Sequence, residues 1–304
     1  MTDRPVLHGA FEAPTSPPSG VVAGPGLLGG MLLALGTGLV LNSLLGPAGA
    51  EVIGYPIPDD GAVISQLVAV DVFALAVVAP LTVCAAVLVL RRRPLGPVLA
   101  MAPAVYTGYM VPQYVLGPQY LRYDGNSEAF FPLQLALFVL GWMTAVLAWR
   151  QMDPAAWAPP GRRERITGGV LIPLLAVATF ARYVPAIIDV AGAHPSAADY
   201  QEAPGYFWAI ALLDLGVGLP AAIAAAAGVR RGTVWARKTA LTLSAWLALI
   251  GPAVGAMAVS AWIRDVPDAS AGQATTMTAL GLLFAALALT LLTALRPVGA
   301  RPAK

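Results

Sequence analysis

The fold is decided by the stretch QLVAVDVFALAVVAPLTVCAAVLVL, residues 66–90, in which 25 consecutive positions hold a single charged side chain, Asp71. Three arginines follow it directly at 91–93. About 20 apolar residues in a helix cross the roughly 30 Å hydrocarbon core of a bilayer. No water is present there to bond backbone groups, so a segment of this kind must be helical. The stretch therefore predicts a transmembrane helix.

Seven further apolar runs of similar length occur along the chain. They cover residues 27–45, 95–116, 131–149, 167–189, 206–229, 239–262 and 274–295. Of all 304 residues, 58% are hydrophobic and 11% are charged, whereas soluble domains hold about 45–50% and about 25%. The composition excludes a soluble globular protein. It predicts an all-α fold class, a polytopic integral membrane protein with eight transmembrane helices.

The basic residues predict how these helices are oriented. Fifteen of the 18 Lys and Arg residues fall in the N-terminal tail, in the linkers that follow residues 90, 149 and 229, and in the C-terminal tail. Short cytoplasmic loops of membrane proteins carry an excess of Lys and Arg. We therefore expect a protein of the cell (plasma) membrane with both termini cytoplasmic and an acidic external face. The large excess of Arg over Lys favours a bacterial source.

Helix 206–229 repeats features of helix 66–90. Each has an Asp early, a Pro near its middle and an Arg run at its exit, with Asp71 and Pro80 in one and Asp214 and Pro220 in the other. Four helices in each half would relate the halves by an axis along the membrane normal. The predicted domains are a flexible cytoplasmic tail at 1–25, four-helix membrane halves at 26–160 and 161–296, and a second cytoplasmic tail at 297–304.

Two short motifs resemble known sequences. The segment LDLG at 213–216, followed by Pro220 and a double Arg, and the stretch YPIPDD at 55–60 are similar to a loose family of bacterial multi-pass membrane proteins without a known activity. The resemblance covers about half of the chain. It implies a multi-pass topology and brings no reaction with it.

Three ionisable side chains lie inside the predicted helices, namely Asp71, Arg182 and Asp214. Each costs roughly 2.5–3.5 kcal/mol on insertion scales, so each needs a partner or water. Their distances from the helix ends put them at a similar depth. We expect Arg182 to lie near one or both carboxylates in an outward-facing polar site. The alternatives are a structural clasp between the halves and an Arg182 that reaches toward Asp189 and water.

Helix 95–116 adds Tyr106, Tyr109 and Gln113, which are spaced by three and four residues and so share one face. They lie in its outer half. Together with the three ionisable residues they form our hypothetical substrate-binding set. The alternative for the tyrosines is packing or membership of the aromatic belt at the membrane interface.

The chain lacks several sequence motifs of classical catalytic sites. It holds no GxxxxGK[ST], HExxH or GxSxG motif, and its only His and Cys residues are His8, His194 and Cys84. We therefore expect no catalytic residues, no cofactor and no metal, and an enzyme is the less favoured class.

These features favour a transporter or solute-binding protein for a small polar solute or ion. The alternative is an accessory or scaffold membrane subunit without catalysis, and a lipid-modifying enzyme comes third. The expected partner is the lipid bilayer, with no nucleic acid, and the sequence names no protein partner.

Overall fold

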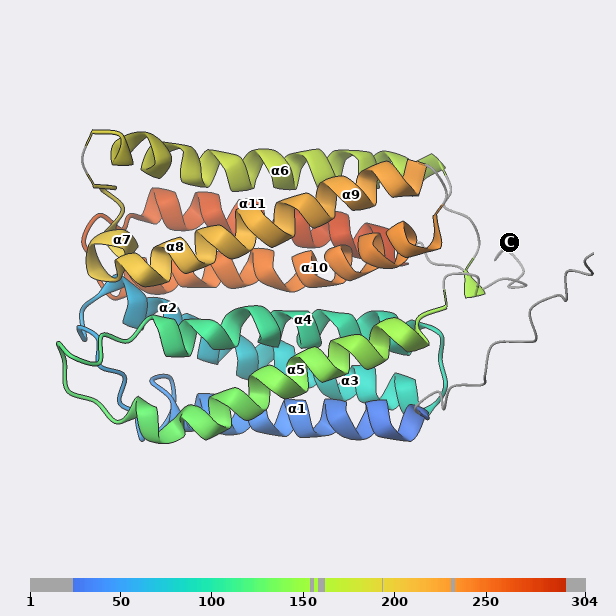
Figure 1. Cartoon of the computed structure of the whole chain (residues 1–304), viewed down its shortest axis with the longest axis horizontal. Coiled ribbons are helices and arrows are strands. Elements are labelled where there is room, and N and C mark those ends of the chain that lie inside the picture. The colour runs from blue at the N-terminus through green and yellow to red at the C-terminus, as the bar shows by residue number, and fades with distance from the viewer. Residues whose placement is uncertain (1–23, 154–155, 158–161, 193, 231–232, 294–304) are drawn as a thin grey trace, which may run out of the picture.

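The long helices lie side by side in one bundle (Figure 1). The structure, a computed structural model, describes residues 24–153, 156–157, 162–192, 194–230 and 233–293. Within these ranges the chain forms helices and no β-strand, which confirms the all-α fold class. The predicted tails at 1–25 and 297–304 lie outside the described residues, apart from 24–25.

The elements follow the predicted order. Those of the first half are α1 (Pro25–Leu45), α2 (Ala62–Phe73), η1 (Ala74–Val78), α3 (Ala79–Leu90), α4 (Leu95–Leu116), η2 (Ser127–Phe130) and α5 (Phe131–Gln151). Those of the second half are α6 (Arg162–Val190), α7 (Ala198–Glu202), α8 (Pro204–Leu213), η4 (Asp214–Gly218), α9 (Leu219–Arg230), α10 (Val234–Ile263) and α11 (Ala271–Thr293). The segments η1 and η4 are π-helical, and each joins its two flanking helices without a break.

Each of the eight apolar runs coincides with a helix or with a continuous series of helices. Seven such segments of the described chain are long and apolar enough to cross a membrane. The remaining helix, α4, is less apolar because it contains several Gly, Pro and Tyr residues. It packs against α3, α5, α8 and α10 and is buried along most of its length. Since its neighbours shield it, it needs fewer apolar side chains. The count of eight crossings stays a prediction.

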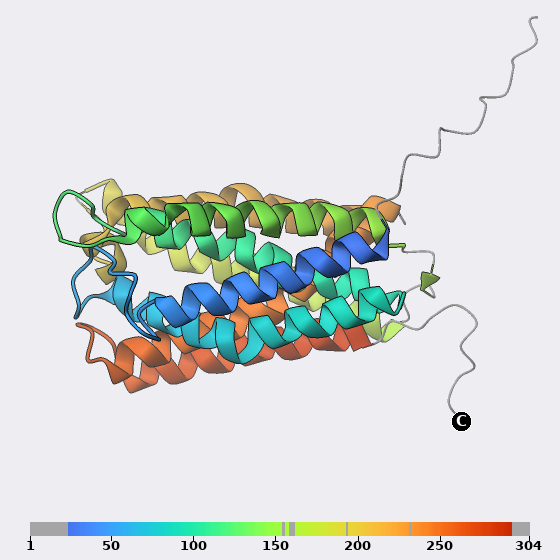
Figure 2. The same cartoon turned by 90° about the horizontal axis from the view of Figure 1, so that it is seen from below.

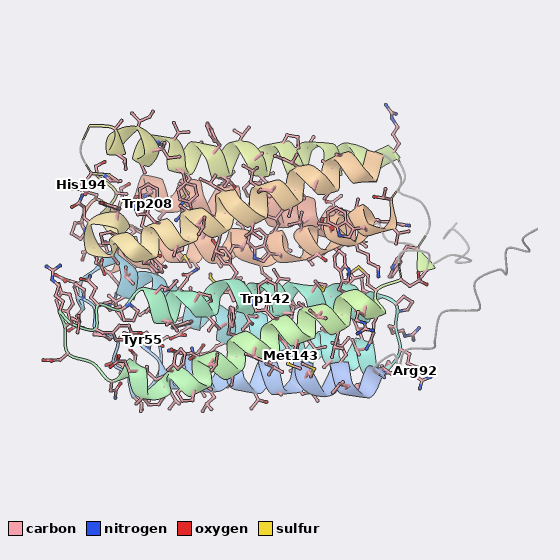
Figure 3. All side chains as sticks on the ribbon, in the orientation of Figure 1. Tyr55, Arg92, Trp142, Met143, His194 and Trp208 are labelled. Carbon is pink, nitrogen blue, oxygen red and sulfur yellow. The ribbon has the colours of Figure 1, made fainter. Side chains whose placement is uncertain are left out.

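The linkers between helices gather at opposite ends of the bundle, as Figures 1 and 2 show. At one end, Gly54 N donates to Asn126 Oδ1 at 2.7 Å and joins the loop after α1 to the loop after α4. Tyr55 and His194 lie at this end, and Arg92 lies at the other (Figure 3). We call the first the loop end and the second the arginine end.

Glu202 of α7 joins the two halves at the loop end. Its carboxylate accepts hydrogen bonds from Ala62 N at 2.6 Å and from Val63 N at 3.2 Å, the first two residues of α2. An anion is favourable at a helix N-terminus because the first N–H groups lack helical partners and the helix dipole is positive there. The second half therefore caps a helix of the first.

A π segment interrupts the helix at an equivalent place in each half. After η1 and after η4, the next backbone N–H bonds to the carbonyl five residues back. The residue after that is a proline in both halves, Pro80 and Pro220. Proline has no N–H to donate, so the regular hydrogen-bond ladder cannot continue through it. The two π segments and the two prolines are each 140 residues apart.

The same offset of 140 residues relates other features of the halves. It pairs Pro112 in α4 with Pro252 in α10. It also pairs Gly141 with Gly281, and both glycines let one helix approach its neighbour closely: at either position a Cβ atom would meet backbone of the facing helix. The predicted 4+4 parallel repeat stays a prediction, and these matches support it.

The two aspartates of the apolar helices, Asp71 and Asp214, do not follow this offset. Counting 140 residues from Asp71 leads to Ala211, three residues before Asp214. Our sequence comparison paired the two aspartates, and that pairing is out of register with the prolines and the π segments. The prolines and the π segments, and not the aspartates, therefore support the 140-residue correspondence between the halves.

Candidate functional site

Asp71 is the most deeply buried charged side chain among the described residues, with 0% of its surface exposed. Tyr114 Oη donates a hydrogen bond to Asp71 Oδ1 at 2.6 Å. The other oxygen, Oδ2, is buried and accepts no hydrogen bond from the residues that the structure describes. One half of this carboxylate therefore lacks the partner that a buried charge requires.

The unpartnered oxygen lies against the C-terminal end of α1. A side chain at Gly46, the residue that ends this helix, would meet Asp71 Oδ2 and the carbonyl oxygen of Asn42. Ser43 and the backbone of Ala48 adjoin the same carboxyl, yet Ser43 Oγ is also buried without a hydrogen bond. The C-terminal end of a helix is the negative end of its dipole, so it does not stabilise an anion.

Three tyrosines complete this region. The Tyr55 and Tyr114 ring centroids are 5.7 Å apart, and Tyr106 packs against Phe73 at 6.0 Å. The Tyr106 hydroxyl is buried without a hydrogen-bond partner in the described chain. Tyr55 lies in the loop before α2, where burial raises its pKa above the ordinary value and the Asp71 charge adds to the effect, so its phenol stays protonated.

We call this group the Asp71 cluster. Its members are Ser43, Tyr55, Asp71, Tyr106 and Tyr114. It is built from α1, the loop after α1, α2 and α4, so all of it belongs to the first half. The groups that interact with the Asp71 carboxyl are hydroxyls and a backbone amide, and none of them carries a positive charge.

Asp214, the first residue of η4, has different surroundings. Tyr109 Oη donates to its Oδ1 and Tyr183 Oη donates to its Oδ2, both at 2.7 Å. The guanidinium carbon of Arg182 lies 5.3 Å from the centre of the Tyr183 ring, and its charge also acts on the Tyr109 hydroxyl. We call these four residues the Asp214 cluster. Here both carboxylate oxygens have donors, and a cation is close by.

The structure thus divides the predicted polar site into two. Tyr106 lies in the Asp71 cluster, whereas Tyr109 and Arg182 lie with Asp214. Asp189, the alternative target for Arg182, accepts hydrogen bonds at 3.3 Å from Ser196 N and Oγ in the following loop. These contacts therefore do not join the carboxylates of Asp71 and Asp214 in a single site.

Gln113, the last predicted site residue, belongs to neither cluster. Tyr206 Oη of α8 lies 2.8 Å from Gln113 Oε1 and 2.9 Å from Gln66 Oε1. A hydroxyl has one proton, so it donates to one of these amides at a time. This buried network connects α2 and α4 with the second half.

The predicted site set left out several of these side chains, although Tyr114 is close to that set in the sequence. Tyr114 lies eight residues after Tyr106 on the same helical face, and this spacing was a usable signal. Tyr183 follows Arg182 directly, but adjacent residues point to different sides of a helix. Nothing in the sequence around Ser43 marks it as a neighbour of Asp71, because the two belong to different helices.

An open groove of about 390 Å³ lies between α1 and the η1–α3 segment. It is lined by Leu33, Gly36, Thr37, Val40, Leu75, Ala79, Pro80 and Val83. No ionisable side chain lines it, so this groove is separate from both aspartate clusters.

Comparison of the chain with protein-family models, with characterised proteins and with solved structures finds no match. The fold defines a class, a multi-pass helical protein whose apolar helices fit a membrane. The resemblance of 55–60 and 213–216 to a bacterial membrane family stays an expectation.

Proposed function

We propose that the protein is a transporter or solute-binding protein of the cell membrane, with a polar site that faces the loop end and accepts a small cationic solute or ion. The observation that carries the proposal is the Asp71 carboxyl, which is fully buried in an apolar helix and has one oxygen without a hydrogen-bond partner among the described residues.

Charged groups inside a membrane are costly and usually mark ion or substrate paths. Two further features support this function. The helix of Asp71 is interrupted by a π segment and a proline, and π segments occur frequently at functional sites. The buried helix α4 supplies tyrosines to both aspartate clusters. A carboxylate lined by tyrosines and without a cationic neighbour favours a positively charged ligand.

The proposal includes eight crossings with both termini in the cytoplasm, so that the loop end faces outward. Reporter fusions after residues 92, 164, 234 and 300 should report cytoplasm, and fusions near 57, 125, 197 and 268 should report the outside. Two or more reversed sites would contradict this topology.

Uptake into liposomes tests the function. The purified full-length protein is reconstituted and given radiolabelled choline, alanine or acetate as a cationic, zwitterionic and anionic probe. We expect choline uptake above that of protein-free liposomes, and a loss of about 10-fold or more for Asp71→Asn with unchanged gel-filtration behaviour. Asp189→Asn is the matched control, because Asp189 lies at the loop end and outside both clusters.

Absence of uptake for all three probes by the wild-type protein would contradict transport. It would favour the accessory-subunit alternative, for which Asp71→Asn should change neither the protein level nor partner binding.

A further inference from the structure

We propose that Asp71 is the anionic ligand of a site for one monovalent metal cation, with Na⁺ as the probe, formed with the side-chain oxygens of Ser43 and Asn42 at the C-terminal end of α1. This inference rests on the proposed function, since it names the ion that the outward polar site would bind.

The charge of the site is the first reason. Asp71 brings one negative charge, and the C-terminal end of α1 adds the negative end of a helix dipole beside it. The hydroxyl and amide groups around the carboxyl bring no positive charge. A buried carboxylate in this environment needs one compensating positive charge.

The available ligands are the second reason. Asp71 Oδ2, Ser43 Oγ and Asn42 Oδ1 are all buried, and none has a hydrogen-bond partner in the described part of the chain. Asn42 and Ser43 are at most 3% exposed. Carboxylate, hydroxyl and amide oxygens are hard ligands, and C-terminal ends of membrane helices coordinate Na⁺ in transporters. Asp71 Oδ2 and Ser43 Oγ lie at the C-terminal end of α1, and Asn42 is the residue before Ser43 in the last turn of that helix.

A single carboxylate matches a monovalent ion in charge. Divalent cations such as Ca²⁺ take six to eight oxygen ligands and usually several carboxylates. Among the described residues no group of three or more His, Cys, Asp or Glu side chains is placed to hold a metal ion. One unit of negative charge with neutral oxygens is therefore balanced by Na⁺ and overbalanced by Ca²⁺ or Mg²⁺.

The second half offers an internal comparison. With the offset of 140 residues, Asn42 corresponds to Arg182 and Ser43 corresponds to Tyr183. The side chains at these two positions of the second half both belong to the Asp214 cluster. The second half therefore carries its own cation at the position where the first half has a neutral amide. A bound cation would supply the missing charge in the first half.

Protonation of Asp71 is the alternative to cation binding as a way to neutralise its charge. The titratable groups that face Asp71 are the phenols of Tyr55, Tyr106 and Tyr114. Protonation would remove the charge of Asp71 without requiring the side-chain oxygens of Ser43 and Asn42 as ligands. The two possibilities differ in whether these oxygens affect a measured Na⁺ affinity.

The experiment is ²²Na⁺ binding to the purified full-length protein in detergent, by scintillation proximity. Unlabelled NaCl competes, and N-methyl-D-glucamine chloride keeps the ionic strength constant. We expect saturable binding of one ion per chain. Asp71→Asn should weaken it by more than about 100-fold through loss of the charge, and Ser43→Ala or Asn42→Ala by about 10-fold through loss of one ligand.

The matched controls are Asp189→Asn and Ser65→Ala. Asp189 bonds to Ser196, and Ser65 bonds to Ser260 of α10, so neither contacts the site. Both variants should bind ²²Na⁺ like the wild type. The Ser43 and Asn42 variants keep the Asp71 charge, so they test the site even if Asp71→Asn does not fold.

Absence of displaceable ²²Na⁺ binding by folded wild-type protein would overturn the inference, and so would binding that none of the three site variants weakens. Choline uptake without Na⁺ binding would overturn the cation site and leave the proposed function standing. Na⁺ binding without uptake of any probe would contradict transport and leave the cation site standing.

Discussion

The first and second halves each hold an aspartate in or close to a π segment, fully buried at Asp71 and half-buried at Asp214, and they give the two carboxylates different partners. Asp214 receives hydrogen bonds from two tyrosines on both of its oxygens and has Arg182 close by. Asp71 receives one tyrosine hydroxyl and leaves its second oxygen unpartnered within the described chain.

Under the proposed function, this difference separates a structural role of Asp214 from a binding role of Asp71. A carboxylate with two donors and a nearby cation is satisfied by the protein itself, so the Asp214 cluster is suited to hold α4 and α6 against η4. A carboxylate that the protein leaves incomplete is suited to take its partner from outside. Under the proposed function, the Asp214 cluster is the clasp and the Asp71 cluster is the binding site.

The largest expected effect distinguishes these roles by stability. Asp214→Asn removes the charged acceptor of two tyrosine hydroxyls, each worth about 1.5–3 kcal/mol, and should lower the free energy of unfolding by about 2–4 kcal/mol. Asp71→Asn removes an uncompensated charge. In Na⁺-free buffer it should therefore lower the free energy of unfolding by less than about 1 kcal/mol, or raise it. Thermal and denaturant unfolding in detergent measure both. The opposite ranking would contradict the assignment.

The second prediction concerns a variant that gives the first half a cation at the position where the second half has Arg182. Asn42→Lys places a cation in the last turn of α1, where the helix dipole favours it, at the position that corresponds to Arg182. We expect ²²Na⁺ affinity to fall by more than about 100-fold and the melting temperature to become independent of Na⁺. Asn42→Ala is the control, since it removes the oxygen without adding charge. Unchanged Na⁺ dependence in Asn42→Lys would break the comparison.

The third prediction concerns Gly46, whose missing side chain leaves room for Asp71 Oδ2. The methyl group of Gly46→Ala would displace the carboxyl or the end of α1, at a cost of about 1–3 kcal/mol, and weaken Na⁺ binding. Gly30→Ala in the same helix is the matched control, because its methyl would meet no atom within 4 Å. Equal stability of the two variants would refute this close approach.

The smallest expected effect is at the contact between the halves. Glu202→Gln keeps the shape of the side chain and removes its charge from the N-terminus of α2, which should cost about 0.5–1 kcal/mol. The exposed Glu128 provides the control variant Glu128→Gln. Unfolding curves that superpose for both variants would mean that the charge of Glu202 contributes nothing measurable.

The helices could be predicted from the sequence because length and hydropathy are local properties. All eight apolar runs coincide with helices. The π segments could not be predicted, because Pro80 and Pro220 indicate only that the hydrogen-bond ladder is interrupted. The form of the interruption depends on packing around it.

The sequence singled out Asp71, Arg182 and Asp214 as charged residues within apolar helices, but it did not indicate which side chains surround each of them. Similar depth put Asp71, Arg182 and Asp214 together, but depth does not fix how each helix is rotated or which helix faces it. The contact of Tyr109 with Asp214 joins residues 105 positions apart. Contacts of this kind depend on tertiary packing, which one sequence does not reveal.

The cap that Glu202 places on α2 also gives the molecule a built-in reporter. The amide protons of Ala62 and Val63 are bonded to a carboxylate more than 130 residues away, so their hydrogen exchange measures how long the loop of the second half stays docked. These amides begin the helix that carries Asp71, nine residues after Ala62. Release of α7 would free the start of that helix, and a change of the exchange rate on adding Na⁺ would show that Na⁺ binding and the docking of α7 are coupled.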